Sequence, residues 1–495
     1  MDHPDLPADP AITGPTGRGP TGPTDRGPTD RGPTGPTDRG PTGRGRSDAG
    51  PTDGLPGHAG GPRGGSHASP LAQLETELAA VAEREVVVRA WVDRPSAGAL
   101  RRSVADAPPG PLQGWTIGVK DVIDAAGLRA ERGAALYQGR TAEADAAAVA
   151  LARQAGAVVA GKTATAELAL VTPTVTTNPH DATRTPGGSS SGSAAAVAAG
   201  MVRLALGTQT AGSVIRPASF CGVVGFKPTF GWVPVSGVHP VSSSLDTMGC
   251  FARSVADVAA LHTALTGQVT YDGSDRGAAG AAAGPLRVGV YRSHQWPAAG
   301  PDTVTVLERA VAALRAAGAV VEPVEPVAGL ADAAVVATTI MLAEVWRSLA
   351  WERSQPEHVL SAGLRRLLAR AERVTADEYA SAQRATIAMR AAFDTAVAGF
   401  DAWLTPAVPG EAPGMETTGD PAFCRVWTLL GGPALTVPAG TGSMGLPVGV
   451  QLVGARWDDA RVLAVGAVLE AAMGQAAEAG VTGGRAAGDA GAGRG

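Results

Sequence analysis

Residues 185–217 read TPGGSSSGSAAAVAAGMVRLALGTQTAGSVIRP, and this stretch determines the class of fold. Glycines and small hydroxyl residues lead into an apolar helix predicted over 193–200, which is followed by a buried strand over 204–207. A turn of small residues then presents Ser213. A flexible Gly/Ser linker is the alternative interpretation of the first part, but linkers do not usually run directly into a helix and a strand. A helix and a strand in close succession are typical of an α/β fold.

The same alternation of strand and helix continues on both sides of this stretch. Ser69 and the proline that follows it predict the start of a first helix. Short apolar runs predict strands, and alanine-rich or amphipathic segments predict helices. The predicted strands cover 115–119, 157–160, 286–290 and 319–321, the predicted helices cover 142–156 and 304–317, and residues 327–399 are mostly helical. The whole pattern indicates a layered α/β protein.

Both ends of the chain have a different composition. Residues 1–68 consist of reshuffled GPT, GPTD and RG units that contain almost no apolar residue. Their glycines do not recur at every third position, which excludes a collagen triple helix. Without apolar side chains to bury, nothing offsets an ordering entropy of about 1–2 kcal/mol per residue. We therefore predict a disordered N-terminal tail over 1–68, a folded domain over 69–473 and a low-complexity C-terminal tail over 474–495.

The composition argues against several classes of protein. The formal net charge is −5, so the chain has no basic footprint for nucleic acid. The three cysteines form no CxxC pair, which argues against a disulfide framework and a cysteine-rich zinc site. No uninterrupted apolar stretch of about 18 residues and no signal peptide occur, so we expect a cytoplasmic protein without a membrane partner. No HExxH spacing is present, and we expect neither a metal nor a cofactor.

Two short motifs match known patterns but lack the structural context that those patterns need. Residues 156–163 satisfy the phosphate-loop pattern GxxxxGK[ST], yet the predicted strand lies inside the motif, so its amides belong to a sheet. Residues 188–192 satisfy the GxSxG nucleophile elbow, but the preceding residues 178–186 favour a turn over a strand. An elbow serine also needs a histidine base. The downstream candidates are His239, His262, His294 and His358, of which His262 is expected to be a packing residue.

Lysine is scarce in this chain. Of the 41 basic residues only Lys120, Lys162 and Lys227 are lysines, and the others are arginines. Arginine stays protonated, whereas a buried lysine can lose its charge by desolvation and act as a general base. Lys120 follows a β-type run and has apolar residues on both sides, which makes it the candidate base. The alternative is a lysine at the end of a strand that pairs with Asp121.

The candidate nucleophile is Ser213. It lies in GTQTAGSVIRP, residues 207–217, where a strand is followed by a turn of small residues. Successive backbone amides of such a turn can point at one anion, which is what an oxyanion hole requires. The serines and free amides at the start of the helix predicted over 193–200 provide further polar groups at close quarters.

These segments resemble the amidase signature family. The resemblance runs from about residue 71 to 473 and is densest between 118 and 253. It rests on long motifs in the order that the family has them, so it is highly specific. The motifs are GGSSSGSAAAVAAG at 187–200, GTQTAGSVIRPASFCGVVGFKPTFG at 207–231, SLDTMG at 244–249, WTLLGGPALTVP at 427–438 and LPVGVQLVG at 446–454. The family implies a single large α/β/α domain whose central mixed, twisted sheet is covered by helices.

The resemblance also implies a Ser-cis-Ser-Lys triad. In it Ser213 is the nucleophile, Ser189 is the bridging serine on a cis peptide, and Lys120 is the base. The intervals between them, 69 and 24 residues, suit this family. The triad attacks an amide, releases ammonia and passes the acyl group to water. The oxyanion would be held by the backbone amides of Thr210, Ala211, Gly212 and Ser213.

Two positions depart from the family's pattern. Ala211 stands where most members have glycine, and its methyl group is expected to narrow the pocket or shift one amide. Ile215 stands where the family commonly has arginine, and Arg216 follows one position later. This arrangement resembles malonamidase-type members, in which the arginine binds the free carboxylate of the substrate, a task that suits the guanidinium fork. A structural salt bridge is the alternative role of Arg216.

The function that the resemblance implies is hydrolysis of a small linear amide to a carboxylate and ammonia, with a substrate that bears a free carboxylate as one form. The alternative is the glutaminase subunit of a tRNA-dependent amidotransferase complex, against which Ile215 counts. A catalytically silent binding scaffold and a histidine-dependent hydrolase are further hypotheses. The expected partner is a small-molecule amide, and the family's frequent dimers suggest a homodimer.

Overall fold

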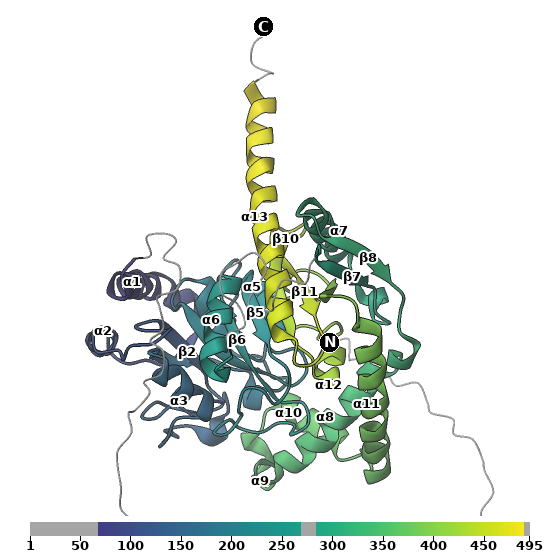
Figure 1. Cartoon of the computed structure of the whole chain (residues 1–495). Helices are drawn as coiled ribbons and strands as arrows, with labels where there is room; N and C mark the ends of the chain where they lie inside the picture. Colours follow the sequence, from purple (N-terminus) through teal and green to yellow (C-terminus); the bar gives the residue numbers. More distant parts are fainter. Residues whose placement is uncertain (1–67, 269–283, 490–495) are drawn as a thin grey trace, which may run out of the picture. The chain divides into compact units, whose positions relative to one another are not determined.

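The computed structural model describes residues 68–268 and 284–489. Of the predicted N-terminal tail only Ala68 falls within these ranges, so the prediction for 1–68 lies outside the described residues. The described part of the folded domain contains one sheet of eleven strands with helices around it (Figure 1). The predicted α/β class and the mixed central sheet are confirmed.

The sheet combines parallel and antiparallel strands. The order along it is β1-β3-β2-β4-β6-β5-β10-β11-β9-β7-β8. In this order β2 is parallel to β3 and β4, β7 is parallel to β8 and β9, and the other neighbours are antiparallel. The strands are β1 (Trp91–Asp93), β2 (Thr116–Lys120), β3 (Val158–Thr163), β4 (Leu204–Gln209), β5 (Val224–Lys227), β6 (Thr247–Ala252), β7 (Arg287–Tyr291), β8 (Val320–Val324), β9 (Ala402–Pro406), β10 (Ala434–Thr441) and β11 (Pro447–Val453).

Thirteen α-helices occur in the described ranges. They are α1 (Pro70–Val88), α2 (Ala97–Ala105), α3 (Ala147–Gln154), α4 (Ser191–Ala198), α5 (Ile215–Cys221), α6 (Val255–Thr266), α7 (Pro301–Ala316), α8 (Ala333–Ser348), α9 (Ala350–Arg353), α10 (Ala362–Ala371), α11 (Ala376–Val397), α12 (Arg425–Leu430) and α13 (Asp459–Asp489). Helix α13 passes the boundary that we predicted at 473, so residues 474–489 of the low-complexity tail are helical.

Alternate residues of the central strands face two different cores. Leu204 and Leu206 of β4 belong to a core that also contains apolar side chains of α3, α6, α7 and α13. Ala205, between them, belongs to a second core with the small residues of α4 and α5. Every residue of β2, β3 and β4 is buried, as expected for parallel strands that are covered on both faces.

Helices α8, α10 and α11 lie in the mostly helical region predicted for 327–399, and α12 packs against α8 and α11 (Figure 1). The stretch Ala328–Ser348, which includes α8, is long and apolar enough to cross a membrane by length and composition, with a mean hydropathy of 1.6. A core helix meets the same criteria, and α8 contributes Ala337 and Ile340 to a core shared with β9 and β10.

Most predicted elements differ by a few residues from their bounds in the structure, and two of them show the cause. The helix predicted from 142 begins at Ala147, because the backbone amides of Ala142 and Ala146 donate to carbonyls in the loop after β2. The strand predicted over 157–160 continues to Thr163, because its last residues pair with both β1 and β2. In both places contacts with distant residues override the local preference of the sequence.

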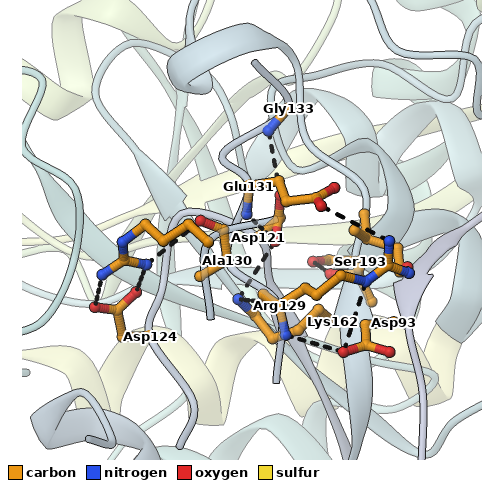
Figure 2. Close-up of polar contacts among 12 residues, drawn as sticks. Asp93, Asp121, Asp124, Arg129, Ala130, Glu131, Gly133, Lys162 and Ser193 are labelled. Carbon is orange, nitrogen blue, oxygen red and sulfur yellow. Dashed lines mark hydrogen bonds and ion pairs between the residues drawn. The ribbon is translucent and has the colours of Figure 1, made fainter. Parts of the chain in front are cut away.

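A buried ion pair fixes the loop that follows β2 (Figure 2). The Nζ atom of Lys162, on β3, lies 3.4 Å from Oδ1 of Asp121 and donates to the carbonyl of Arg129 at 3.2 Å. Asp121 also accepts hydrogen bonds from the backbone amides of Glu131 and Gly133, both at 3.2 Å. Burial lowers the pKa of Lys162 and raises the pKa of Asp121, and the opposite charge of each partner counteracts the shift. The pair therefore ties this loop to the sheet.

Asp121→Asn is expected to lower the free energy of unfolding by about 3 kcal/mol, because it leaves the Lys162 amine buried without an opposite charge. Urea unfolding followed by circular dichroism measures this. The control is Glu75→Gln, which removes one partner of an ion pair with Arg101 on the surface and is expected to leave the unfolding midpoint unchanged. Equal midpoints for Asp121→Asn and the wild-type protein would contradict the role of the buried pair.

Candidate active site

The residues of the predicted triad come together at one edge of the sheet. Lys120 is the last residue of β2, Ser213 lies in the turn between β4 and α5, and Ser189 precedes α4. Strands β2 and β4 are adjacent and parallel, so their carboxyl ends meet at the same edge. Lys120 is 0% exposed, Ser189 is 1% exposed and Ser213 is 7% exposed. The predicted nucleophile is therefore the member of the three that solvent reaches best.

The amine of Lys120 contacts hydroxyl groups. Its Nζ atom lies 2.8 Å from Oγ of Ser189 and 2.7 Å from Oγ1 of Thr208, and the Thr208 carbonyl is 3.5 Å away. The alternative in which Lys120 pairs with Asp121 is wrong, because Asp121 pairs with Lys162. A neutral amine can donate to Thr208 while it accepts a hydrogen bond from Ser189. This geometry suits a base that takes a proton from Ser189.

Burial changes the charge of this amine. Removal from water lowers the pKa of Lys120 from 10.5 to about 7. Smaller effects come from the negative charge of Asp246, which raises this pKa, and from the positive charge of Arg216, which lowers it. Near neutral pH a large fraction of the molecules therefore carries Lys120 in the neutral form that a general base requires.

The bridging serine is held in place through its backbone. The peptide bond between Gly188 and Ser189 is cis, as the resemblance implied. The carbonyl of Ser189 accepts hydrogen bonds from the amide of Ala166 and the hydroxyl of Thr165, both at 3.1 Å. Both donors follow β3, so the strand next to β2 helps to orient the hydroxyl that contacts Lys120.

The turn that carries Ser213 offers free backbone donors. Within the described ranges, no acceptor takes a hydrogen bond from the amides of Ala211, Gly212 or Ser213. These are three of the four donors that we predicted for an oxyanion, and each is available to a ligand. The fourth predicted donor, Thr210, directly follows β4, and its hydroxyl donates to Oδ1 of Asp246 at 2.5 Å.

Gln209 and Thr428 fix the shape of this turn. The Oε1 atom of the fully buried Gln209 accepts hydrogen bonds from the amides of Val214 and Ile215, at 2.9 and 3.1 Å. Its Nε2 atom donates to Oγ1 of Thr428 at 3.0 Å, and Thr428 in turn donates to the carbonyl of Ala211 at 3.0 Å. One side chain therefore supports both flanks of the turn, before and after the nucleophile.

Two small residues of the turn, Gly212 and Ala211, differ in the space available for a Cβ atom. A Cβ atom at Gly212 would lie 2.9 Å from Nη1 of Arg216 and 2.9 Å from Cβ of Cys424, so only glycine fits there. Ala211, which departs from the family's pattern, is only partly buried, and the fold accommodates its methyl group.

Arg216 binds carbonyl groups in the interior. Its Nε atom donates to the carbonyl of Thr418 at 2.7 Å, and one of its terminal nitrogens, Nη2, donates to the carbonyl of Gly188 at 2.6 Å. Among the described residues its hydrogen-bond acceptors are carbonyl and hydroxyl oxygens and no carboxylate, so the alternative role in a structural salt bridge is not seen there. Burial lowers the pKa of Arg216 to about 10, so the guanidinium stays charged near neutral pH. The other terminal nitrogen, Nη1, is buried and has no hydrogen-bond partner among the described residues.

The other residues and motifs that the sequence analysis considered make contacts that support the fold. The amine of Lys227 donates to the carbonyls of Pro228 and Gly432. His262 is buried and packs edge-on against Phe226 and Trp232, at ring-centroid distances of 5.2 and 5.5 Å. Strand β3 runs through the motif that resembles a phosphate loop, as predicted. No group of three or more His, Cys, Asp or Glu in the described ranges is arranged to hold a metal ion.

Sequence reasoning missed several residues that shape the site, among them Thr208, Gln209 and Thr418. Thr208 and Gln209 lie inside a motif that we quoted, and their signal was a polar side chain at the end of an otherwise apolar strand. Thr418 lies in a segment without any motif, 202 residues away from Arg216, which it contacts. No local pattern predicts that contact.

Comparison with known proteins identifies the class. A family model described as Amidase matches residues 87–463. The chain therefore belongs to the amidase signature family, whose members are hydrolases that act on C–N bonds.

Relatives with curated descriptions and solved structures support this assignment. The chain is 33% identical over 446 residues to a glutamyl-tRNA(Gln) amidotransferase subunit from Symbiobacterium thermophilum, and the match covers 79% of this chain and 91% of that protein. The crystal structure of an amidase matches with a TM-score of 0.72 and 31% identity, over 82% of this chain and 96% of the other. A 6-aminohexanoate cyclic dimer hydrolase in complex with its substrate matches with a TM-score of 0.71 and 28% identity, over 82% and 94% of the two chains.

Because a charged Lys120 cannot accept a proton, we expect the rate at which a fluorophosphonate labels the protein to rise with pH through about 7. Lys120→Met is expected to lower this rate by about 10²- to 10⁴-fold, the usual contribution of a general base. Lys120→Arg keeps the positive charge but cannot become neutral, so it is expected to be equally slow. The rates are measured by gel fluorescence with a fluorescent probe between pH 5.5 and 9. Rapid labelling of Lys120→Arg would contradict the role of a neutral amine.

Proposed function

We propose that this protein hydrolyses an amide through an acyl-enzyme on Ser213, with Ser189 and Lys120 as its proton relay. The observation that carries the proposal is the buried contact of 2.8 Å between Nζ of Lys120 and Oγ of Ser189. A second lysine in the same layer, Lys162, contacts Asp121 instead. The fold therefore gives one lysine a carboxylate partner and the other a hydroxyl partner, which is the arrangement that a base needs.

The chemistry follows from this arrangement. Oγ of Ser213 attacks the carbonyl carbon, its proton passes to Oγ of Ser189, and the proton of Ser189 passes to the neutral amine of Lys120. The free amides of Ala211, Gly212 and Ser213 donate to the oxyanion of the tetrahedral intermediate. When the C–N bond breaks, the relay returns a proton to the departing nitrogen, and ammonia leaves. Water then attacks the acyl-serine by the same route and releases the carboxylate.

Arg216 supports a substrate with a second, anionic group. Its Nη1 atom lies next to Gly212, is buried and lacks a partner among the described residues. A buried donor that carries positive charge is favourable only when an acceptor completes it. A free carboxylate of the substrate would supply that acceptor. Since Gly212 belongs to the turn that holds the oxyanion, such a carboxylate would lie close to the scissile amide.

The glutaminase subunit of a tRNA-dependent amidotransferase is the second candidate, and the curated relatives favour it. The relative from Symbiobacterium thermophilum is described as an amidotransferase subunit, and it matches 79% of this chain. Glutamine also has a side-chain amide and a free carboxylate, so Arg216 is compatible with both candidates. In the second candidate the partners would be further subunits and a tRNA, and ammonia would be passed on instead of released.

An ammonia-release assay on the purified protein separates the two candidates. The panel is malonamate, succinamate, L-glutamine and propionamide, which differ in whether they carry a carboxylate and in its distance from the amide. A free-standing amidase is expected to release ammonia from an acidic amide without any partner. A glutaminase subunit is expected to be slow on the whole panel by itself. Ser213→Ala is expected to abolish every such activity, and full turnover in this variant would refute the proposed mechanism.

The substitution Arg216→Gln tests whether Arg216 binds a carboxylate of the substrate. It is expected to lower kcat/KM for the acidic amides of the panel by about 10- to 100-fold more than for propionamide, because a charge-assisted hydrogen bond contributes about 1.5–3 kcal/mol. Both values are expected to fall in part, since the same side chain holds the carbonyls of Gly188 and Thr418. An equal loss of kcat/KM on acidic and neutral amides would show that Arg216 does not bind the carboxylate of the substrate and has only a structural role.

A further inference from the structure

A carboxylate that the mechanism above does not use lies beside the nucleophile turn. Asp246 directly precedes β6, and β6 pairs with β4 in a register that places Thr247 opposite Gln209. The side chain of Asp246 therefore faces the point where β4 ends and the turn begins. Its Oδ1 atom accepts the hydrogen bond from the hydroxyl of Thr210.

Thr210 and Thr208 connect this carboxylate to the base. Thr208 belongs to β4, and Thr210 directly follows the strand. Oγ1 of Thr208 contacts the amine of Lys120 at 2.7 Å, and Oγ1 of Thr210 contacts Asp246 at 2.5 Å. The carboxylate and the base therefore contact two threonines that are two positions apart, and the negative charge of Asp246 acts on the Lys120 amine.

Asp246 is held by several hydrogen-bond donors. Its Oδ2 atom accepts hydrogen bonds from the amides of Val241 and Ser242, at 2.8 and 2.9 Å, and its own amide donates to the carbonyl of Ser242 at 2.8 Å. Burial raises the pKa of Asp246, and the hydrogen bonds from Thr210, Val241 and Ser242 oppose that rise. Because all these partners of the carboxylate donate, they favour its charged form.

The loop that contains Asp246 is anchored in the helical region. The carboxylate of Glu344, on α8, accepts hydrogen bonds from the hydroxyl of Ser242 at 2.5 Å and from the amide of Ser244 at 2.9 Å. The hydroxyl of Tyr379, on α11, donates to the same carboxylate at 2.8 Å. Two helices thereby fix the position of the loop, which makes it a firm support for Asp246.

We propose that Asp246 is a positioning residue of this site, which orients the nucleophile turn through Thr210 and acts on the Lys120 amine through its negative charge. This inference rests on the proposed function. Neither Asp246 nor Thr210 transfers a proton in the reaction. Their contribution is to hold the first amide of the turn and to set the electric field around the base.

The charges that face Lys120 are few, so the effect of removing one has a definite sign. Asp246 approaches from the loop before β6, and Arg216 approaches from α5. Asp121, the next residue in the chain, is turned to Lys162, and the groups in contact with the amine, Ser189 and Thr208, carry no charge. Without the negative charge of Asp246, the protonated amine loses its attractive partner, and Arg216 remains. The base then becomes neutral at a lower pH.

The test measures the rate of labelling by a fluorophosphonate against pH for the wild-type protein and for variants. In Asp246→Asn and Asp246→Ser the midpoint of the rise is expected to move to lower pH by about one unit, the effect of removing a nearby opposite charge. The rate on the plateau is expected to fall as well, because the turn is less well held. Two charge-removing variants are used so that a folding defect in one of them leaves the other to decide.

Two control variants separate the effect of the Asp246 charge on Lys120 from the support that Asp246 gives to the turn. Thr210→Val removes the hydrogen bond between the turn and Asp246 but keeps the carboxylate. The labelling rate on the plateau is therefore expected to fall, while the midpoint of the pH profile stays at the wild-type pH. Glu344→Gln removes a carboxylate that anchors the same loop from α8 but is not among the charges that act on Lys120, so its midpoint is also expected to stay.

The outcomes distinguish this inference from the function on which it rests. A midpoint that stays at the wild-type pH in both Asp246 variants would overturn the inference, while labelling that depends on Ser213 and Lys120 would still support the proposed function. A wild-type protein that is not labelled, or a Ser213→Ala variant that is labelled at the wild-type rate, would overturn both.

Discussion

Lys120 brings a primary amine to a place that water does not reach, 2.8 Å from the hydroxyl of Ser189 and 2.7 Å from that of Thr208. A charged ammonium group there loses its hydration and has only neutral groups in direct contact, so burial favours the neutral amine. That preference depends on the strands around it, because β2, β3 and β4 are buried along their whole length. The mixed sheet therefore creates the basicity that the chemistry needs, in addition to holding the groups in position.

Lys162 and Lys120 lie on neighbouring strands of the sheet, but the groups that contact their amines are different. Lys162 faces Asp121, and the two charges compensate each other inside the protein. Lys120 is the direct neighbour of Asp121 in the sequence but contacts hydroxyl groups. If Asp121 faced the other amine, that amine would be held in its charged form. The ion pair thus has an indirect consequence for the site, since it directs the carboxylate that follows Lys120 in the sequence away from the base.

Much of the site could be predicted because its residues lie in motifs where chemistry restricts the choice: a lysine at the end of a strand, a serine before a helix and a serine in a turn of small residues. The layered α/β fold was also predictable from the alternation of short apolar runs and helices, and the mixed sheet followed from the resemblance to the family. What escaped prediction depends on residues that are distant in sequence. Arg216 meets Thr418 across 202 positions, and Gln209 meets Thr428 across 219 positions. The late start of α3 has the same cause, since a loop competes for its first amides. A cytoplasmic location and a homodimer stay predictions.

The complete burial of Lys120 affects how the candidate active site responds to the solvent. Of the three residues in the relay, Ser213 is the most exposed, and the amine at the other end is 0% exposed. In the relay that we propose, a proton on this buried amine leaves through the hydroxyls of Ser189 and Ser213. Dissolved buffer molecules therefore cannot intercept it. In that mechanism the acidity of the medium sets the charge of the base, while dissolved salts and buffers reach only the exposed end of the relay at Ser213.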